Sequence, residues 1–163
     1  MSGTHSASRT AKVSIAAASE LLPKLSPEQR SLASFDFAAD ERYNWHYVPK
    51  ARQGIALGEM SVSQREAALA MIAGGLSDDG YRKALSIIDH EAILGSIEAG
   101  VGVGRWDRDS GLYYFTVFGT PGTEEPWGWR VEGHHLSLNY AIVDGEAVSP
   151  TPSFFGANPA SVP

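Results

Sequence analysis

The chain contains no cysteine and no long run of apolar residues. The absence of cysteine excludes disulfide bonds, thiolate metal ligands and cysteine nucleophiles, and it fits a reducing compartment such as the cytoplasm. No stretch approaches the roughly 20 apolar residues that a membrane-spanning helix needs, so we expect a soluble protein without a membrane partner. Basic residues are few, because 13 Lys and Arg stand against 19 Asp and Glu. An acidic chain without a basic block predicts no binding to nucleic acid.

Two common enzyme motifs are missing as well. The segment 101–104, Val-Gly-Val-Gly, follows a predicted helix instead of a strand. It also lacks the Lys-Ser/Thr ending of a phosphate-binding loop. No Gly-x-Ser-x-Gly elbow occurs in the sequence, which argues against a hydrolase with a serine triad.

The distribution of residue types predicts the fold class. Alanine concentrates in the first half of the 163 residues, whereas glycine, proline and aromatic residues concentrate in the second half. Alanine favours helix, and aromatic runs separated by glycine favour short strands. We therefore predict a single domain of the α+β class over residues 1–163. Its expected parts are N-terminal helices (about 9–98), an antiparallel β-sheet (about 112–149) and an extended tail (150–163).

Capping residues mark the expected helix starts. Ser26-Pro27-Glu28-Gln29 and Ser61-Val62-Ser63-Gln64 each place a serine three residues before a glutamine, which is the pattern of a capping box. Ser77-Asp78-Asp79 puts two carboxylates at the start of a third helix, which should run to about Glu98. An earlier helix is expected over 9–22.

The second half is expected to form strands joined by turns. Leu112–Phe118 is rich in aromatic and β-branched residues, which predicts a strand. Trp127–Val143 is predicted as one long strand, with Gly133 as the point where it can bend. Asp144-Gly145 predicts a two-residue hairpin turn, because both residues tolerate the positive φ of a type I′ turn.

The strongest chemical signal is the histidine pair in this long strand. Alternate residues of a strand share a face, so we expect His134 on an apolar face with Leu136. His135 then shares a polar face with Ser137 and Asn139, which makes it the better candidate to line a pocket.

These histidines suggest a site for a divalent transition metal, zinc or similar. Such a site usually needs three protein ligands and an open position. We predict His134 and His135 as ligands, with His46 as the third, because its aromatic segment 43–54 is expected to cross the sheet as an extended strand or loop. A structural role for the pair and acid–base work without a metal are the alternatives. Glu132 and His135 are candidate catalytic residues.

Glu91 interrupts an apolar stripe on the third helix. The stripe follows the spacing i, i+3, i+4 and contains Ala84, Ile87, Ile88 and Leu94. A buried carboxylate is costly unless it is paired, so we expect a partner among Arg52, Arg130 and the histidines. Glu91 is a further candidate catalytic residue, and a structural ion pair is the alternative.

Four residues are candidates for substrate binding. Arg52 and Arg130 carry planar guanidinium groups that bind anionic or carbonyl-bearing molecules. Trp127 and Trp129 share one strand face and can stack on sugar rings or cations. Core packing is the alternative for both tryptophans.

Several segments resemble an uncharacterised family known as domain of unknown function 3500. The resemblance runs from about residue 25 to the end, and Gly-His-His-Leu-Ser at 133–137 is its most specific part. It implies no activity, but members look longer, so it implies an N-terminal portion or a shortened member. The similar segments are Trp45–Pro49, Arg52 with Gly54, Leu76–Tyr81, Tyr114–Gly119, Trp127–Asn139 and Phe154–Pro159.

The residues together predict an enzyme based on histidine and carboxylate groups, using a divalent metal and acting on a small polar or anionic substrate. The alternative is a non-catalytic module that binds a small ligand in a pocket of tryptophans and arginines. The content of bound metal distinguishes the two.

Overall fold

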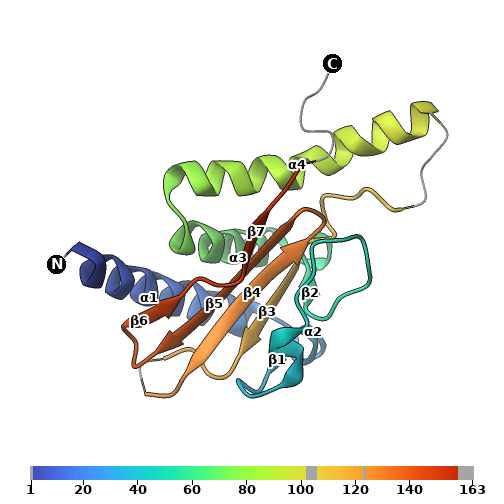
Figure 1. Ribbon diagram of the computed structural model, residues 1–163. Helices are drawn as coiled ribbons and strands as arrows, with labels where there is room; N and C mark the ends of the chain where they lie inside the picture. Colours follow the sequence, from blue (N-terminus) through green and yellow to red (C-terminus); the bar gives the residue numbers. More distant parts are fainter. Residues whose placement is uncertain (1, 102–105, 123, 158–163) are drawn as a thin grey trace.

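A computed structural model describes residues 2–101, 106–122 and 124–157 (Figure 1). Within these ranges, the helices and the mixed sheet confirm the α+β class. The last residues of the predicted tail, 158–163, and the glycines of segment 101–104 lie outside the described residues.

The helices are α1 (Ser2–Leu21), α2 (Pro27–Ala33), α3 (Val62–Gly75) and α4 (Asp78–Val101), with short 3-10 turns at Leu22–Lys24, Asp40–Tyr43 and Leu57–Glu59. The strands are β1 (Ser34–Phe35), β2 (Ile55–Ala56), β3 (Tyr114–Phe118), β4 (Trp127–Gly133), β5 (Leu136–Val143), β6 (Ala147–Ser149) and β7 (Ser153–Phe155).

The helix starts follow the predicted capping. The Ser26 and Ser61 side chains accept hydrogen bonds from the backbone of Gln29 and Gln64, and both glutamines bond back to the serine backbone. Each box satisfies N–H groups that would otherwise lack a partner. Helix α1 starts at Ser2, well before the predicted start at residue 9. Its sequence is rich in alanine and serine, and no residue in it marks where the helix begins.

The strands within 112–149 pair antiparallel, as predicted, and a short strand from the N-terminal part makes the whole sheet mixed. Its strand order is β1-β3-β4-β5-β6, while β2 also pairs with β3 and β7 pairs with β5. Strand β1 runs parallel to β3, with Ser34 opposite Val117. Both β1 and β2 come from the part predicted as helical. Each has two residues, which is too short for an alternating pattern in the sequence.

The predicted long strand Trp127–Val143 is two strands, β4 and β5, that form an antiparallel hairpin. Gly133 pairs with Leu136, so His134 and His135 are the turn between them. His135 has a φ of 63°, in the left-handed region that histidine tolerates better than most residues. The prediction failed because apolar and polar residues continue to alternate through the turn.

The turn predicted at Asp144-Gly145 is present, but its loop is one residue longer than the two-residue loop expected. Asp144 and Gly145 both have positive φ, 53° and 63°. Val143 pairs with Ala147, so Glu146 also belongs to the loop and strand β6 starts at Ala147. Part of the tail forms β7, which pairs with β5.

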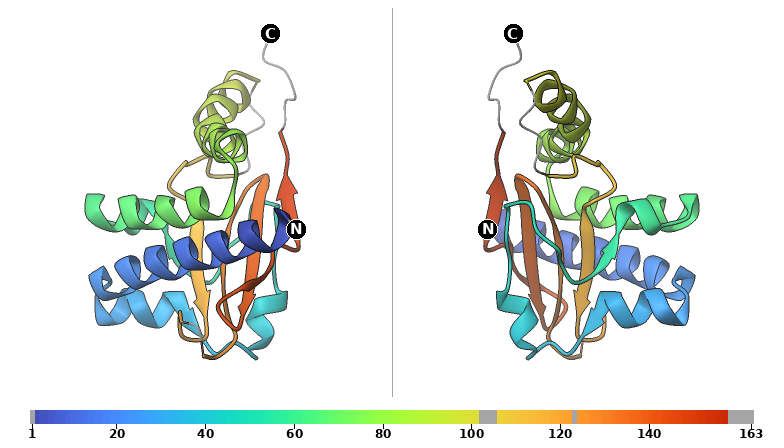
Figure 2. Two further views of the ribbon diagram at one scale, coloured as in Figure 1. Left: turned by 90° about the vertical axis from the view of Figure 1, so that its left-hand side faces the viewer. Right: turned by 90° about the vertical axis from the view of Figure 1, so that its right-hand side faces the viewer.

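Two layers cover the sheet (Figure 2). Helices α1 and α3 lie on one face, over apolar side chains such as Trp129, Val131 and Leu138. The segment 36–54 lies on the opposite face, over polar side chains. Helix α4 lies at the end of the sheet where β4 turns into β5 (Figure 1). No helix of the described residues is long and apolar enough to cross a membrane.

Candidate functional site

The histidine turn meets helix α4 at Glu91. The Nδ1 atom of His134 lies 2.6 Å from Oε1 of Glu91, whose residue is only 4% exposed. The rings of His134 and His135 stack with their centroids 3.7 Å apart. Glu91, His134 and His135 can each offer one ligand atom such that all three atoms lie within 4.8 Å of one another. The expectation that the two histidines face opposite sides is therefore wrong, since a turn and not a strand carries them.

Neighbouring segments fix the backbone of this turn on several sides. A turn held in this way can present its side chains in one orientation. The bonds are His135 N–H to Tyr47 O (2.9 Å), Gly156 N–H to His135 O (2.8 Å), Tyr113 O–H to His134 O (2.8 Å) and Arg52 Nη2 to Gly133 O (3.1 Å).

Tyr113 also requires glycine at position 133. A methyl group on Gly133 would overlap the Tyr113 ring, which lies directly against the backbone there. The phenol is fully buried, and burial raises its pKa above the ordinary value. Tyr113 therefore acts as a neutral hydrogen-bond donor that ties the turn to the core.

Arg108 completes the cluster, although the sequence analysis did not identify it. Its Nη1 lies 3.0 Å from Nδ1 of His134 and 3.8 Å from Oε2 of Glu91. Its Nε and Nη2 donate to the carboxylate of Glu98, at 2.8 and 2.7 Å. These bonds lower the pKa of Glu98 and raise that of Arg108. No sequence signal identifies Arg108, because its partners come from a helix and a turn distant in the sequence.

The hydrogen bonding of His134 depends on these two neighbours. Its Nδ1 can donate a hydrogen bond to Glu91 or accept one from Arg108, but it cannot do both at once. At His135, burial and the adjacent His134 lower the pKa. The lowered pKa favours the neutral form of the His135 imidazole, which is the form that binds metals.

Two clefts reach this cluster from different sides. One has a volume of about 210 Å³ and is lined by Glu91 and His134, together with Arg52 and Trp106. The other, of about 180 Å³, is lined by Glu91 and His135. Glu91 thus lies between two clefts, and each histidine faces one of them.

His135 lines a cleft without its expected companions. Ser137 and Asn139 are buried and bonded to each other, and Asn139 also donates to the carbonyl of Pro152. They belong to the polar face of the sheet, away from His135.

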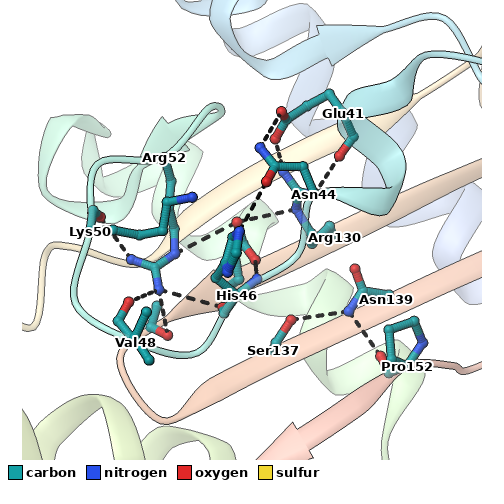
Figure 3. Close-up of polar contacts among 12 residues, drawn as sticks. Glu41, Asn44, His46, Val48, Lys50, Arg52, Arg130, Ser137, Asn139 and Pro152 are labelled. Carbon is teal, nitrogen blue, oxygen red and sulfur yellow. Dashed lines mark hydrogen bonds and ion pairs between the residues drawn. The ribbon is translucent and has the colours of Figure 1, made fainter.

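Glu132 lies in a separate buried cluster on that polar face, and its partners Arg52, Arg130 and His46 are labelled in Figure 3. Its Oε1 is 3.6 Å from Nε of Arg52 and 3.5 Å from Nε of Arg130, and its Oε2 accepts from the backbone N–H of His46 at 2.7 Å. Burial raises the pKa of Glu132, although both guanidinium groups act in the opposite direction. The structure does not bring Glu132 to the histidine pair.

The other predicted residues are placed as follows. The ring of His46 contacts Asn44, at 3.0 Å, and not the histidine pair, so Glu91 takes the place expected for it. Arg130 is fully buried against Glu41. Of the two arginines, only Arg52 lines a cleft of the site, and its guanidinium already donates to several backbone carbonyls.

Both tryptophans lie in the core. Trp127 and Trp129 are at most 1% exposed. The Trp129 ring stacks on Tyr140 at 4.2 Å, and its Nε1 donates to Ser14 on helix α1. This is the alternative that the sequence left open, and the geometry gives no support to substrate binding by either ring.

A comparison with family models places the chain among known sequences. The model described as "Protein of unknown function (DUF3500)" matches residues 7–163. The chain belongs to this family. The match includes the whole histidine turn and Glu91, and it extends the resemblance at 25–163 to nearly all of helix α1. No curated protein and no solved structure matches the chain.

Proposed function

We propose that Glu91, His134 and His135 bind a divalent transition metal in an enzyme that acts on a small polar or anionic substrate. The observation that carries the proposal is the meeting of three potential ligand atoms within 4.8 Å. Two imidazoles and one carboxylate are a donor set used for catalytic zinc and for non-haem iron. Three protein ligands leave further positions for water or substrate.

The cost of building this cluster supports a functional role. Glu91 is buried, and an ionised carboxylate is expensive to bury without partners. His135 keeps a positive φ, which costs a non-glycine residue on the order of 1–2 kcal/mol. Such costs concentrate at functional sites, where the surrounding structure enforces them.

Metal binding would require a small rearrangement of the rings. Histidine donates to a metal in the plane of its ring, and two rings stacked at 3.7 Å with an interplanar angle of 28° hold their lone pairs in separate, nearly parallel planes. One ring must therefore turn out of the stack. Arg108 must also yield at Nδ1 of His134, if that atom is the ligand.

The roles of the chain's own residues follow from their places. A bound metal would polarise a carbonyl or phosphoryl oxygen, or lower the pKa of a water molecule. Glu91 and the histidines would hold it, and the cleft lined by Trp106 and Arg52 would admit the substrate. Arg108 lies where negative charge on a substrate would need a counter-ion. The absence of cysteine fits this chemistry in a reducing compartment, and we propose the cytoplasm.

The alternative is a non-catalytic module that binds a small anion without a metal. The 3.0 Å approach of Arg108 to His134 favours it, since a guanidinium beside an imidazole nitrogen competes with a metal there. In that case Glu91 and His134 orient Arg108 toward the anion, and the cluster holds no metal ion.

Metal binding by the untagged protein tests the proposal. Metal content is measured by mass spectrometry after purification, and Zn²⁺ and Co²⁺ are titrated calorimetrically into chelator-treated protein. Micromolar or tighter binding at one site is expected, with loss in Glu91→Gln and His135→Ala. His46→Ala is the matched control, because it removes an imidazole outside the cluster and should bind like the parent. No binding by the parent, or equal binding by His135→Ala, contradicts the metal site.

A further inference from the structure

We infer that Arg108 is the anchor for a small oxyanion, a carboxylate or phosphate group, that binds beside the metal. This inference rests on the proposed function and identifies the part of the substrate that the site recognises. The proposed metal ligands do not explain why Arg108 lies beside them. The side chain of Arg108 is only 9% exposed, yet its Nη1 is directed at the ligand set.

One edge of the Arg108 guanidinium is bonded to Glu98, and its other edge faces the proposed metal ligands. Its Nε and Nη2 form a fork that holds both oxygens of Glu98. Nη1 lies 3.0 Å from His134 and 3.8 Å from Glu91. Both of these groups become metal ligands in the proposed function. A metal bound through Nδ1 of His134 would therefore take the acceptor that Nη1 now approaches, and Nη1 would face the open coordination positions.

The charges of this cluster do not balance when a divalent metal is bound, and an anion would balance them. Glu98 offsets Arg108, and Glu91 offsets only one of the two charges of the metal, because both histidines bind as neutral rings. The cluster retains one excess positive charge in a place where Glu91 and Arg108 are nearly inaccessible to solvent. Buried charge without a partner is costly. A monoanion that touches both the metal and Nη1 removes the excess.

Guanidinium groups bind carboxylates and phosphates strongly because their donors match the spacing of the oxygens. Glu98 fixes the orientation of the guanidinium before the ligand arrives, which reduces the entropy lost on binding. The cleft of about 210 Å³ beside His134 sets the size, and a small molecule fits it. Its charged lining is mixed, with Lys50 and Arg52 against Glu91, Asp107 and Asp109. Arg108 is not one of these lining residues, and its Nη1 meets the cleft at His134, 3.0 Å away, which is where an anion at the metal would reach it.

The test uses the full chain loaded with Co²⁺, whose visible absorption changes when an anion enters its coordination shell. Oxalate and inorganic phosphate are titrated separately, so that the two sources of the oxyanion are distinguished. In Arg108→Gln the anion affinity should fall about tenfold to a hundredfold, the usual effect of losing a charged hydrogen bond. Metal affinity should stay the same or rise, since a repelling cation is removed. Arg108→Lys keeps the charge without the fork and should give an intermediate anion affinity.

Arg82→Gln is the matched control, because Arg82 is an exposed arginine of helix α4 that pairs with Asp79. It should bind both metal and anion like the parent. If the parent binds Co²⁺ and Arg108→Gln binds the anions equally well, the inference is wrong while the metal site stands. If the parent binds no metal, the proposed function fails, and anion titration of the metal-free protein decides the role of Arg108. Anion binding that Arg108→Gln abolishes then supports the anchor, and no binding overturns it.

Discussion

Glu91 of helix α4 and His134 of the β4–β5 turn are 43 residues apart in the sequence, and their side chains meet at 2.6 Å between Oε1 and Nδ1. This bond joins the helix at the end of the sheet to the tip of the central hairpin (Figure 1). Arg108 approaches the same two side chains from a third segment. The cluster therefore contributes to stability as well as to the proposed chemistry, and the two contributions can be separated by mutation.

Glu91→Ala should lower the free energy of unfolding by about 3 kcal/mol. The substitution leaves Arg108 with one carboxylate instead of two and removes the partner of His134. Urea denaturation followed by circular dichroism measures the loss. Asp89→Ala is the control, because Asp89 is exposed on the same helix and should change stability little. A Glu91→Ala variant as stable as the control would show that the carboxylate is solvated.

His135→Gly should be more stable than His135→Ala by about 1 kcal/mol. Both substitutions remove the imidazole, but only alanine retains the cost of the φ of 63°. Both variants should lose metal binding. A difference in stability between them therefore reports the backbone strain at position 135 and not the loss of a metal ligand. Thermal melting and Zn²⁺ titration of the two proteins check this. Equal stability of the two variants would mean that the turn relaxes when the ring is removed.

Tyr140 should make the protein sensitive to alkali. Burial raises its pKa to about 12, and its O–H donates to the carbonyl of Gly75 at the end of helix α3. A raised pKa in the folded state means that folding favours the neutral phenol. The contribution of Tyr140 is therefore complete below pH 10, the ordinary tyrosine pKa, and is lost as the pH rises from 10 to about 12.

Tyr140→Phe tests this directly. It should cost about 1 kcal/mol at neutral pH, because one buried hydrogen bond is lost and Gly75 keeps an unpaired carbonyl. The gap between parent and variant should narrow as the pH rises from 10 to 12, measured by urea denaturation at each pH. Tyr43→Phe is the control, since Tyr43 is 66% exposed. A gap that stays constant with pH would refute the assignment.

Local sequence signals predicted much of the fold. The capping serines, Ser26 and Ser61, and the Asp144-Gly145 turn act over a few residues, so their patterns can be read directly from the chain. The turn at His134 could not be recognised, because it lacks an Asn-Gly or Asp-Gly pair and its residues continue the alternation of a strand. The turn is defined by the pairing of β4 with β5, which the local sequence pattern does not reveal.

The site was predicted in part for a similar reason. The apolar stripe of helix α4 predicted the burial of Glu91, and of the expected partners, Arg52, Arg130 and the histidines, a histidine is the one that the structure places against it. The choice of His46 over Glu91 as the third ligand was wrong, because it depended on how the segment 43–54 crosses the sheet. Arg108 depends on packing between distant segments, which a single sequence does not encode locally.

Gly95→Ala should weaken anion binding without removing the metal ligands. A methyl group at Gly95 would lie 2.9 Å from Cβ of Arg108, so the segment that carries Arg108 must move away from helix α4. The guanidinium then loses its place beside His134, while Glu91 and the histidines keep theirs. We expect oxalate affinity to fall about tenfold in the Co²⁺-loaded protein, as for loss of one charged hydrogen bond, with unchanged Co²⁺ affinity.

Gly100→Ala is the matched control for this substitution. It lies on the same helix, and a methyl group there would meet no atom of the described residues within 4 Å. Both substitutions favour helix by up to about 1 kcal/mol, so a difference in anion affinity between them reports the contact with Arg108 and not helix propensity. Equal oxalate affinities in the two variants would show that Arg108 does not need its position against Gly95. A loss of Co²⁺ binding in Gly95→Ala would show instead that the segment of Arg108 supports the metal ligands themselves.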